Sequence, residues 1–267
     1  MHTSFTCNFL VIKISYHTHM KFKTIFVSDI HLGTKFSKAE KFLSFLKESE
    51  SENIYLVGDI IDGWAMKRKI KWAQSHSDVI QKLLRKARKD TNVYFITGNH
   101  DDFIRPFLPL ILGDRLYVND SFEYEALNGK KFYITHGDFF DSITMTKKWV
   151  AVLGDYGYDV LLHLNGVINF FRRVFGVKRY WSFSKYVKDN VKKSVSFIND
   201  FEGVLSRHAK HEGYDGVICG HIHHAGMKEI DGIVYFNCGD WVESCTALVE
   251  TLEGEWKIID WLEEYED

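Results

Sequence analysis

Five short polar segments, each directly after an apolar run, are the feature that most restricts what this chain of 267 residues can form. The segments read DIH from Asp29, GDIID from Gly58, GNHD from Gly98, HGD from His136 and GHIH from Gly220. Any one of them arises often by chance. All five in order, each after a run with the length and composition of a buried strand, predict one site built from loops far apart in the sequence.

The first half of the chain alternates between strand and helix patterns. Apolar runs at residues 23–28, 53–57 and 92–97 indicate strands, and residues 38–47 and 75–89 carry helical spacing. This alternation predicts an α/β protein with a parallel sheet and right-handed crossovers. Sites in such sheets form beyond the carboxyl ends of the strands, where the first three polar segments lie.

The second half of the chain has a different pattern. We expect a helix at residues 103–112, a hairpin at residues 121–135 around Asn128-Gly129, and short strands from 216 to 261. Between them, residues 142–212 read as helical throughout. We interpret this block as a cap inserted into one domain of residues 21–267.

Three further observations, on the N-terminal residues, a helix cap and the apolar runs, complete the outline. Residues 1–20 do not match the rest and lack the basic segment and cleavage site of a signal peptide, so we read them as an N-terminal extension, with a real N-terminal arm as the alternative. Ser75 is the expected cap of the helix at 75–89. No apolar run approaches the roughly 20 residues that a membrane-spanning helix needs.

The residue types in the five segments suit hard or borderline divalent cations. Such ions prefer carboxylate, imidazole and amide oxygen ligands to thiolates. A single carboxylate between two ions can bridge them, and Asp59 is the natural candidate, while Asn99 offers a neutral carbonyl oxygen. The four cysteines form no CxxC pair, which favours a reduced, cytoplasmic setting.

Together the five segments resemble those of the calcineurin-like metallophosphoesterase superfamily, from Phe22 to about Leu262. The resemblance implies a four-layer αββα sandwich with a helical insert, and hydrolysis of a phosphoester or pyrophosphate bond. The implied first metal site is Asp29, His31, Asp59 and His223, and the implied second is Asp59, Asn99, His136 and His221. It gives His100 the role of catalytic histidine and Asp62 that of the acid orienting it. A hydroxide bridging two divalent ions would attack phosphorus in line.

A narrower resemblance is to the UDP-2,3-diacylglucosamine diphosphatase family of lipid A synthesis. It rests on Asp62-Gly63-Trp64, the helical insert and Gly239-Asp240-Trp241. It implies a nucleotide-linked lipid substrate, manganese as the first choice of metal with iron or zinc as alternatives, and a cytoplasmic protein peripheral to the inner membrane. The implied substrate contacts are Asn190, Lys193 and Asp141.

Two departures leave other functions open. That narrower family typically has arginine where this chain has His100, and commonly arginine where it has His224. A phosphodiesterase or phosphatase acting on another soluble substrate therefore stays an alternative. So does a paralogue that binds metal without catalysis. The net charge of −2 gives no global basic field, so no nucleic-acid partner is expected.

The helical block itself has two readings. Its many apolar and aromatic residues interleave with basic ones between Arg172 and Arg179. Such a segment can line an acyl-chain groove or lie on an anionic membrane surface. Equally, the apolar residues can simply pack the cap onto the domain.

Other polar residues near the segments have ordinary explanations. We expect Asp101 and Asp102 to cap the helix that follows, and Asp138 to fix a metal-bound histidine from behind. His224 is not expected to be a ligand. The remaining histidines that we read as surface or satisfied core residues are His76, His163, His208 and His211.

Overall fold

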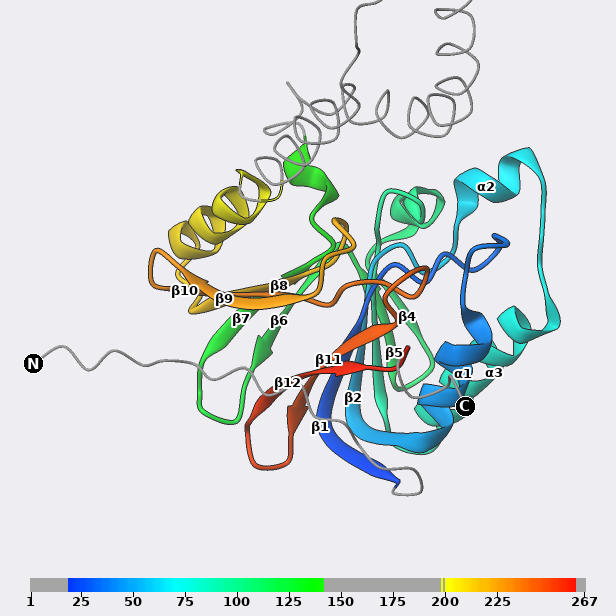
Figure 1. Cartoon of the computed structure of the whole chain (residues 1–267), viewed down its shortest axis with the longest axis horizontal. Coiled ribbons are helices and arrows are strands. Elements are labelled where there is room, and N and C mark those ends of the chain that lie inside the picture. The colour runs from blue at the N-terminus through cyan, green and yellow to red at the C-terminus, as the bar shows by residue number, and fades with distance from the viewer. Residues whose placement is uncertain (1–18, 142–197, 199, 263–267) are drawn as a thin grey trace, which may run out of the picture. The chain divides into compact units, whose positions relative to one another are not determined.

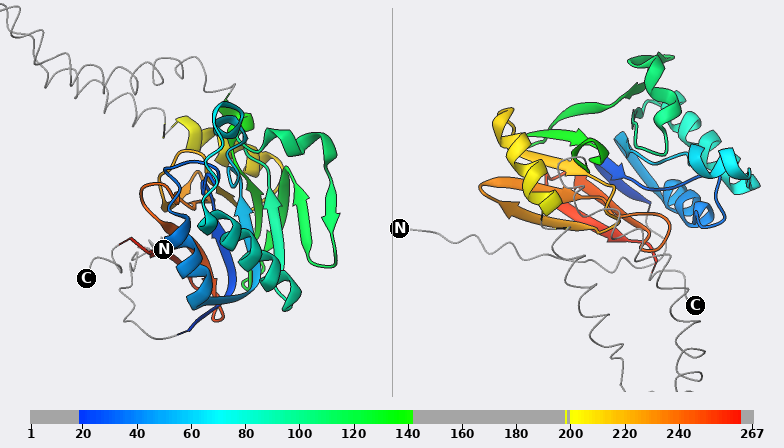
Figure 2. Two further views of the ribbon diagram at one scale, coloured as in Figure 1. Left: turned by 90° about the vertical axis from the view of Figure 1, so that its right-hand side faces the viewer. Right: turned by 90° about the horizontal axis from the view of Figure 1, so that it is seen from above.

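The computed structural model describes residues 19–141, 198 and 200–262. The chain divides into two compact units, Met1–Asp138 with Ser206–Asp267, and Phe139–Leu205. The first unit contains two β-sheets and the helices that cover them (Figures 1 and 2). The predicted extension, apart from its last two residues, and most of the predicted cap lie outside the described residues.

A seven-stranded sheet carries the alternating half of the chain. Its order is β12-β11-β1-β2-β3-β5-β4, and β1, β2, β3 and β5 run parallel. The strands are β1 (Met20–Val27), β2 (Ser49–Val57), β3 (Asn92–Ile96), β4 (Leu110–Leu112), β5 (Leu116–Asn119), β11 (Thr246–Thr251) and β12 (Trp256–Asp260). Helices α1 (Ala39–Glu48) and α3 (Gln74–Arg88) lie in the connections from β1 to β2 and from β2 to β3. The predicted parallel core is therefore confirmed.

A five-stranded sheet carries the later strands in the order β6-β7-β8-β10-β9. The strands are β6 (Ser121–Glu125), β7 (Lys131–Thr135), β8 (Gly216–Cys219), β9 (Gly226–Ile230) and β10 (Ile233–Asn237). The β6–β7 hairpin has the predicted place, and its loop closes with a 2.9 Å hydrogen bond from Ala126 N–H to Lys130 O. Strand β8 pairs in parallel with both β7 and β10. The strands before and after the predicted cap, β7 and β8, therefore lie side by side in one sheet.

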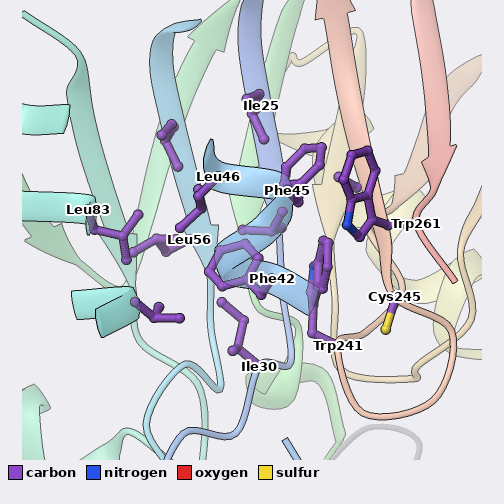
Figure 3. Packing of buried hydrophobic residues seen from close by; sticks show 14 of the residues in the cluster. Ile25, Ile30, Phe42, Phe45, Leu46, Leu56, Leu83, Trp241, Cys245 and Trp261 are labelled. Atoms are coloured by element: carbon purple, nitrogen blue, oxygen red, sulfur yellow. The ribbon is translucent and has the colours of Figure 1, made fainter. Parts of the chain in front are cut away.

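Alternation along the strands divides the core into two layers. In β2, Ile54 and Leu56 belong to a cluster shared with α1 and α3, whereas Tyr55 and Val57 belong to a cluster shared with the five-stranded sheet. Because successive strand residues point to opposite faces, the seven-stranded sheet is covered on both sides. Figure 3 shows the first of these clusters, beneath α1.

The two sheets face each other, with helices on the outer faces (Figure 2). On the outer face of the five-stranded sheet, the helical residues 206–211 lie over β7, where the His208 ring is 5.4 Å from that of Tyr133. This arrangement of two sheets and covering helices agrees with the expected sandwich. No helix among the described residues has both the length and the apolar character needed to cross a bilayer.

The predicted helix at residues 103–112 is wrong. The structure has a short 3-10 helix, Asp102–Phe107, followed by an extended segment and β4. Pro106 has no N–H to donate within a helix, and Pro109 disfavours helical geometry for the residue before it. The two prolines therefore end the helix early and leave the following residues to pair with β5.

Helix boundaries near the second polar segment also differ from expectation. A short helix, α2 (Gly63–Arg68), was not predicted; Asp62 caps it by accepting a 2.7 Å hydrogen bond from Ala65 N–H. The capping prediction for Ser75 is wrong, because α3 begins one residue earlier after Ala73, with no side-chain cap.

Candidate metal centre

Loops after β1, β2, β3, β7 and β8 come together beyond the carboxyl ends of the strands (Figure 1). Backbone hydrogen bonds join them. Asp29 N–H donates to Gly58 O at 3.0 Å, and His31 N–H donates to Asp59 O at 2.9 Å. Between the loops after β7 and β8, Gly220 N–H donates to the carbonyl oxygen of His136 at 3.2 Å. The loops are thus fixed to one another before any ligand is considered.

Five of the candidate ligands have left-handed backbone conformations. The φ angles are 53° at Asp29, 51° at His31, 54° at Asp59, 72° at His221 and 51° at His223. Non-glycine residues seldom adopt positive φ, and those that do gather at functional sites, where surrounding contacts hold the strain. The backbone therefore marks the same residues as the sequence pattern, through an independent property.

Two glycines allow the close approach of these loops. A Cβ atom on Gly98 would lie 2.1 Å from Asp59 Oδ1, and one on Gly58 would lie 2.3 Å from the His136 ring. Gly58 also has a positive φ of 81°. Only a residue without a side chain fits either position.

Three overlapping groups of side chains bring their ligand atoms within 4.8 Å of one another. The groups are Asp29, His31 and His223; His31, Asp59 and His100; and Asp59, His136 and His221. Asp59 belongs to two groups, and its Oδ2 lies 3.3 Å from His136 Nε2. Carboxylate and imidazole groups that lie this close together are a suitable ligand set for divalent cations.

Buried polar atoms at the centre support the same reading. His31 Nε2, Asn99 Oδ1 and His136 Nε2 are buried and make no hydrogen bond within the described part of the chain. His31 Nε2 lies 3.9 Å from both Asp29 Oδ1 and Asp59 Oδ2, too far for a hydrogen bond to either. Buried polar atoms normally have partners, and a cation bound among these atoms would supply one.

The other ring nitrogen of His136 is already engaged. Its Nδ1 lies 2.9 Å from Val57 O, which orients the ring so that Nε2 faces Asp59. This contact comes from the seven-stranded sheet, whereas His136 follows β7 of the other sheet.

The charges of the centre stabilise one another. Burial acts to raise the pKa of Asp59, but His136, followed by His100 and His31, holds that pKa well below its usual range. Burial likewise opposes the charged form of His136, yet Asp59 and then Asp29 raise its pKa to about 10. Burial also opposes the charged form of Asp29, but His223 and then His136 hold its pKa below the usual range. Both carboxylates are therefore ionised at neutral pH, which is the state that binds cations, whereas a cation that binds His136 must displace the proton of its ring.

His100 lies at the rim of this cluster beside Asp62. Its Nδ1 is 2.9 Å from Asp62 Oδ1, and its backbone N–H donates to Asp59 Oδ1 at 2.8 Å. The second oxygen of Asp62 is 3.3 Å from His31 Nδ1. Burial lowers the pKa of His100, but Asp62 and Asp59 outweigh it and raise that pKa. The exposed Trp64 ring, 4.5 Å away between centroids, covers His100 from the solvent side.

Asp101 has a role that the sequence did not reveal. It makes no helix-capping bond, so that prediction is wrong. Instead its buried carboxylate accepts hydrogen bonds from Ile60 N–H at 3.0 Å, Ile61 N–H at 2.8 Å and Gly98 N–H at 3.3 Å. Burial and then Asp59 raise the pKa of Asp101 to about 7. Asp101 thus supports the loop that carries Asp59.

Two residues, one at the end of β10 and one in the loop after it, support the first and last loops of the centre. Trp241 N–H donates to Asp29 O at 3.0 Å, and Asn237 Nδ2 donates to Gly220 O at 2.8 Å. Asp138 was expected to fix a histidine, but among the described residues it pairs with Arg105, whose Nη2 is 2.7 Å from Asp138 Oδ2. No signal in the sequence distinguishes Asn237 from an ordinary strand residue.

The histidines read as ordinary behave as such where they are described. His76 is buried and accepts a 3.0 Å hydrogen bond from Gly33 N–H, while His211 and His224 are exposed. Asp141 is buried and belongs to the second unit. Asn190, Lys193 and His163 lie outside the described residues, so the substrate contacts stay predictions.

With this geometry established, comparison with known proteins is informative. A family model for calcineurin-like phosphoesterases matches residues 22–225. The chain belongs to this family. The expected family is confirmed, and with it the coarse assignment as a metallophosphoesterase superfamily hydrolase whose members use divalent metals.

Most of the curated relatives that match this calcineurin-like phosphoesterase share one name, at low identity, although one is a DNA polymerase II small subunit of Methanothermobacter thermautotrophicus, 26% identical over 48% of this chain and 33% of that protein. It is 27% identical to UDP-2,3-diacylglucosamine hydrolase of Porphyromonas gingivalis over 126 residues, 45% of this chain and 47% of that protein. It is 22% identical to a Neisseria meningitidis serogroup C protein of the same name over 263 residues, 90% of this chain and 98% of that protein. The chain spans about half the length of several curated relatives that it matches.

Similarity to solved structures is weaker. A structure of an archaeal phosphodiesterase is 17% identical, with a TM-score of 0.45, over 89% of this chain and 98% of that one. The sequence identity and the TM-score are both too low to bear on function.

Proposed function

We propose that this protein hydrolyses a phosphoester or pyrophosphate bond at a centre of two divalent cations. The observation that carries the proposal is the position of Asp59, shared between two ligand groups that contain histidines from both sheets. A carboxylate in that position suits a bridging ligand. The buried, unsatisfied atoms of His31, Asn99 and His136 support occupancy on both sides of it.

The proposed ligands are those that the family resemblance implies, and the groups agree with them in large part, with Asp59 joined to His31 through the group that also contains His100. Asp29, His31, Asp59 and His223 would hold one ion, and Asp59, Asn99, His136 and His221 would hold the other. Bound ions would neutralise phosphoryl oxygens and activate water at neutral pH. We propose manganese as the native metal on the resemblance to the UDP-2,3-diacylglucosamine diphosphatase family. Iron and zinc are alternatives, because carboxylate, imidazole and amide ligands suit all three metals.

His100 and Asp62 supply the acid chemistry in this proposal. Asp62 Oδ1 lies 2.9 Å from His100 Nδ1, on the side of the ring away from the cluster, and His100 Nε2 lies 3.8 Å from Asp59 Oδ2. A proton held at Nε2 can pass to the leaving oxygen of the substrate. General-acid assistance of this kind contributes roughly 10²–10⁴-fold to rate.

The test of the chemistry compares three variants of the full chain. Asp59→Ala should lose bound metal and all activity on a generic phosphodiester. His100→Asn should keep its metal content and lose about 10²-fold or more in kcat. His211→Asn, an exposed histidine beside Glu212, is the control and should match the wild type. A fully active His100→Asn would remove His100 from the mechanism.

For the substrate, we propose a nucleotide-linked lipid of the UDP-2,3-diacylglucosamine type. The names of the relatives in Porphyromonas and Neisseria support this choice, as do the Asp62-Gly63-Trp64 and Gly239-Asp240-Trp241 segments. A cytoplasmic protein at the inner membrane surface would meet such a substrate. Purified protein with manganese should release UMP from UDP-2,3-diacylglucosamine.

The departure at His100 favours a second candidate, a phosphodiesterase or phosphatase acting on a soluble substrate. Turnover of a generic phosphodiester without UMP release would select this candidate. Metal binding without turnover in a broad panel of phosphoesters would instead indicate a paralogue that has lost catalysis.

A further inference from the structure

A separate cavity lies at the opposite end of the seven-stranded sheet from the metal centre. It has a volume of about 470 Å³ and is lined by the first residues of β1 and β2 and by the last turns of α1 and α3. The length of β2 places it roughly 25–30 Å from Asp59, at a rise of about 3.3 Å per residue. Its volume is within the range of pockets that hold small molecules.

The cavity wall carries an excess of unpaired positive charge. The carboxylates in the wall already have cationic partners: Glu50 with Lys21, Glu52 with Lys23, and Asp90 with Arg115. Four other cations line the cavity and pair with no carboxylate in the described part of the chain: Lys47, Lys82, Arg85 and Lys89. An anion entering here would therefore meet donors that no protein group has taken.

Lys86 makes the case stronger, because its charge is buried. The residue is only 9% exposed, and within the described part of the chain its ammonium donates one hydrogen bond, 2.5 Å long, to Ser49 O. A lysine ammonium has three donors, so two remain. Burial, followed by the charge of Lys82, lowers the pKa of Lys86 to about 8. Glu50 acts in the opposite direction, but it is also paired with Lys21 and does not outweigh the other two effects. A buried charge that is only weakly compensated is costly, and proteins usually pair it.

We propose that this cavity binds a small phosphorylated anion, whose phosphate group lies against Lys82, Arg85 and Lys86. Arg85 and Lys86 lie in the last turn of α3, where basic residues also complement the helix dipole, whereas Lys82 lies before that turn. The dipole does not account for the buried ammonium of Lys86 or for the cavity in front of it. A bound phosphate fills the cavity and supplies the negative charge that Glu50 provides only weakly to Lys86.

The experiment measures binding of inorganic phosphate and pyrophosphate to the full chain by calorimetry, with a chelator present so that no metal is loaded at the catalytic centre. The test variant is Lys82→Gln/Arg85→Gln. The control is Lys130→Gln/Lys131→Gln, which removes the same charge from an exposed lysine pair in the β6–β7 hairpin. Because the readout is binding without turnover, its failure is distinct from failure of the proposed hydrolysis.

We expect the test variant to bind about ten- to a hundredfold more weakly than the wild type, and the control to bind as the wild type does. In a second measurement, phosphate should raise the pKa of Lys86 in a carbon-13 titration of its Cε. Equal binding by all three proteins, together with an unchanged Lys86 titration, would overturn the proposal.

A third arm identifies where the phosphate comes from. Vesicles of phosphatidylcholine with phosphatidylglycerol present it on a lipid headgroup. Vesicle binding that the test variant loses and the control keeps, with no binding of free phosphate, would assign the site to a headgroup. Binding of free phosphate alone would assign it to a soluble ligand.

Discussion

At the scale of single residues, the centre depends on atoms that approach closely from different loops. Gly98→Ala would place a Cβ atom 2.1 Å from Asp59 Oδ1 and 2.5 Å from Asp59 N. We expect a destabilisation of about 1–3 kcal/mol and at least partial loss of bound metal, because the loop after β3 must move away. Denaturant unfolding and metal analysis check this.

Gly226→Ala is the matched control, since a Cβ atom there meets nothing within 4 Å. It should change neither quantity. Equal metal content in the two variants would contradict the close packing of Gly98 against Asp59.

Asp101 offers a second test at this scale. Asp101→Asn replaces one acceptor oxygen with a donor, facing the backbone N–H groups of Ile60, Ile61 and Gly98. We expect a loss of about 1–3 kcal/mol in the free energy of unfolding. Asp102→Asn changes the neighbouring, less buried carboxylate and should cost much less, as denaturant titration would show.

The sequence was informative at this scale about residue types and less so about their supports. The ligand residues could be predicted because their chemistry and spacing form a pattern. Asp101 and Asn237 could not, because their partners are backbone groups of segments far away in the chain. Before folding, Asp101 fits a helix-capping pattern equally well.

At the scale of elements, α1 shows how one apolar face fixes a helix to a sheet. Phe45 is fully buried, and its ring lies 5.4 Å from that of Trp241 and 5.5 Å from that of Trp261 (Figure 3). Phe45→Ala should therefore lower the free energy of unfolding by about 3–5 kcal/mol. Leu84→Ala, on the exposed face of α3, should lower it by less than about 1 kcal/mol.

Elements with strong periodicity could be predicted, and short ones could not. The three parallel strands and the helices between them follow from alternation and helical spacing. Helix α2 has only six residues, and its formation depends on Asp62, which the sequence pattern had assigned to chemistry alone. The segment after Asp101 departs from expectation because its apolar residues fit a helix while its prolines do not.

At the scale of the whole molecule, the metal should contribute to stability. Cations that bind only the folded chain stabilise it by mass action, by about 4 kcal/mol at a thousandfold excess over Kd. Chelation should therefore lower the Tm by several degrees, and added manganese should restore it. Scanning calorimetry checks this, and an unchanged Tm after verified metal removal would contradict it.

The pairing of distant segments is what the sequence could least reveal at this scale. Strand β11 pairs with β1 across more than two hundred residues, and nothing local to residues 246–251 specifies that partner. The five polar segments implied convergence of their loops, but not which sheet would carry each one.

That distribution has a mechanical consequence. Asp29, Asp59 and Asn99 follow strands of the seven-stranded sheet, whereas His136 and His221 follow strands of the other. Ions held in common by these side chains would link the two sheets more firmly than the apolar contacts and the hydrogen bonds, such as that from His136 Nδ1 to Val57 O, that already join them. Removing the metal should then weaken the contact between the two sheets before either sheet unfolds. Amide exchange of residues at that contact would speed up first.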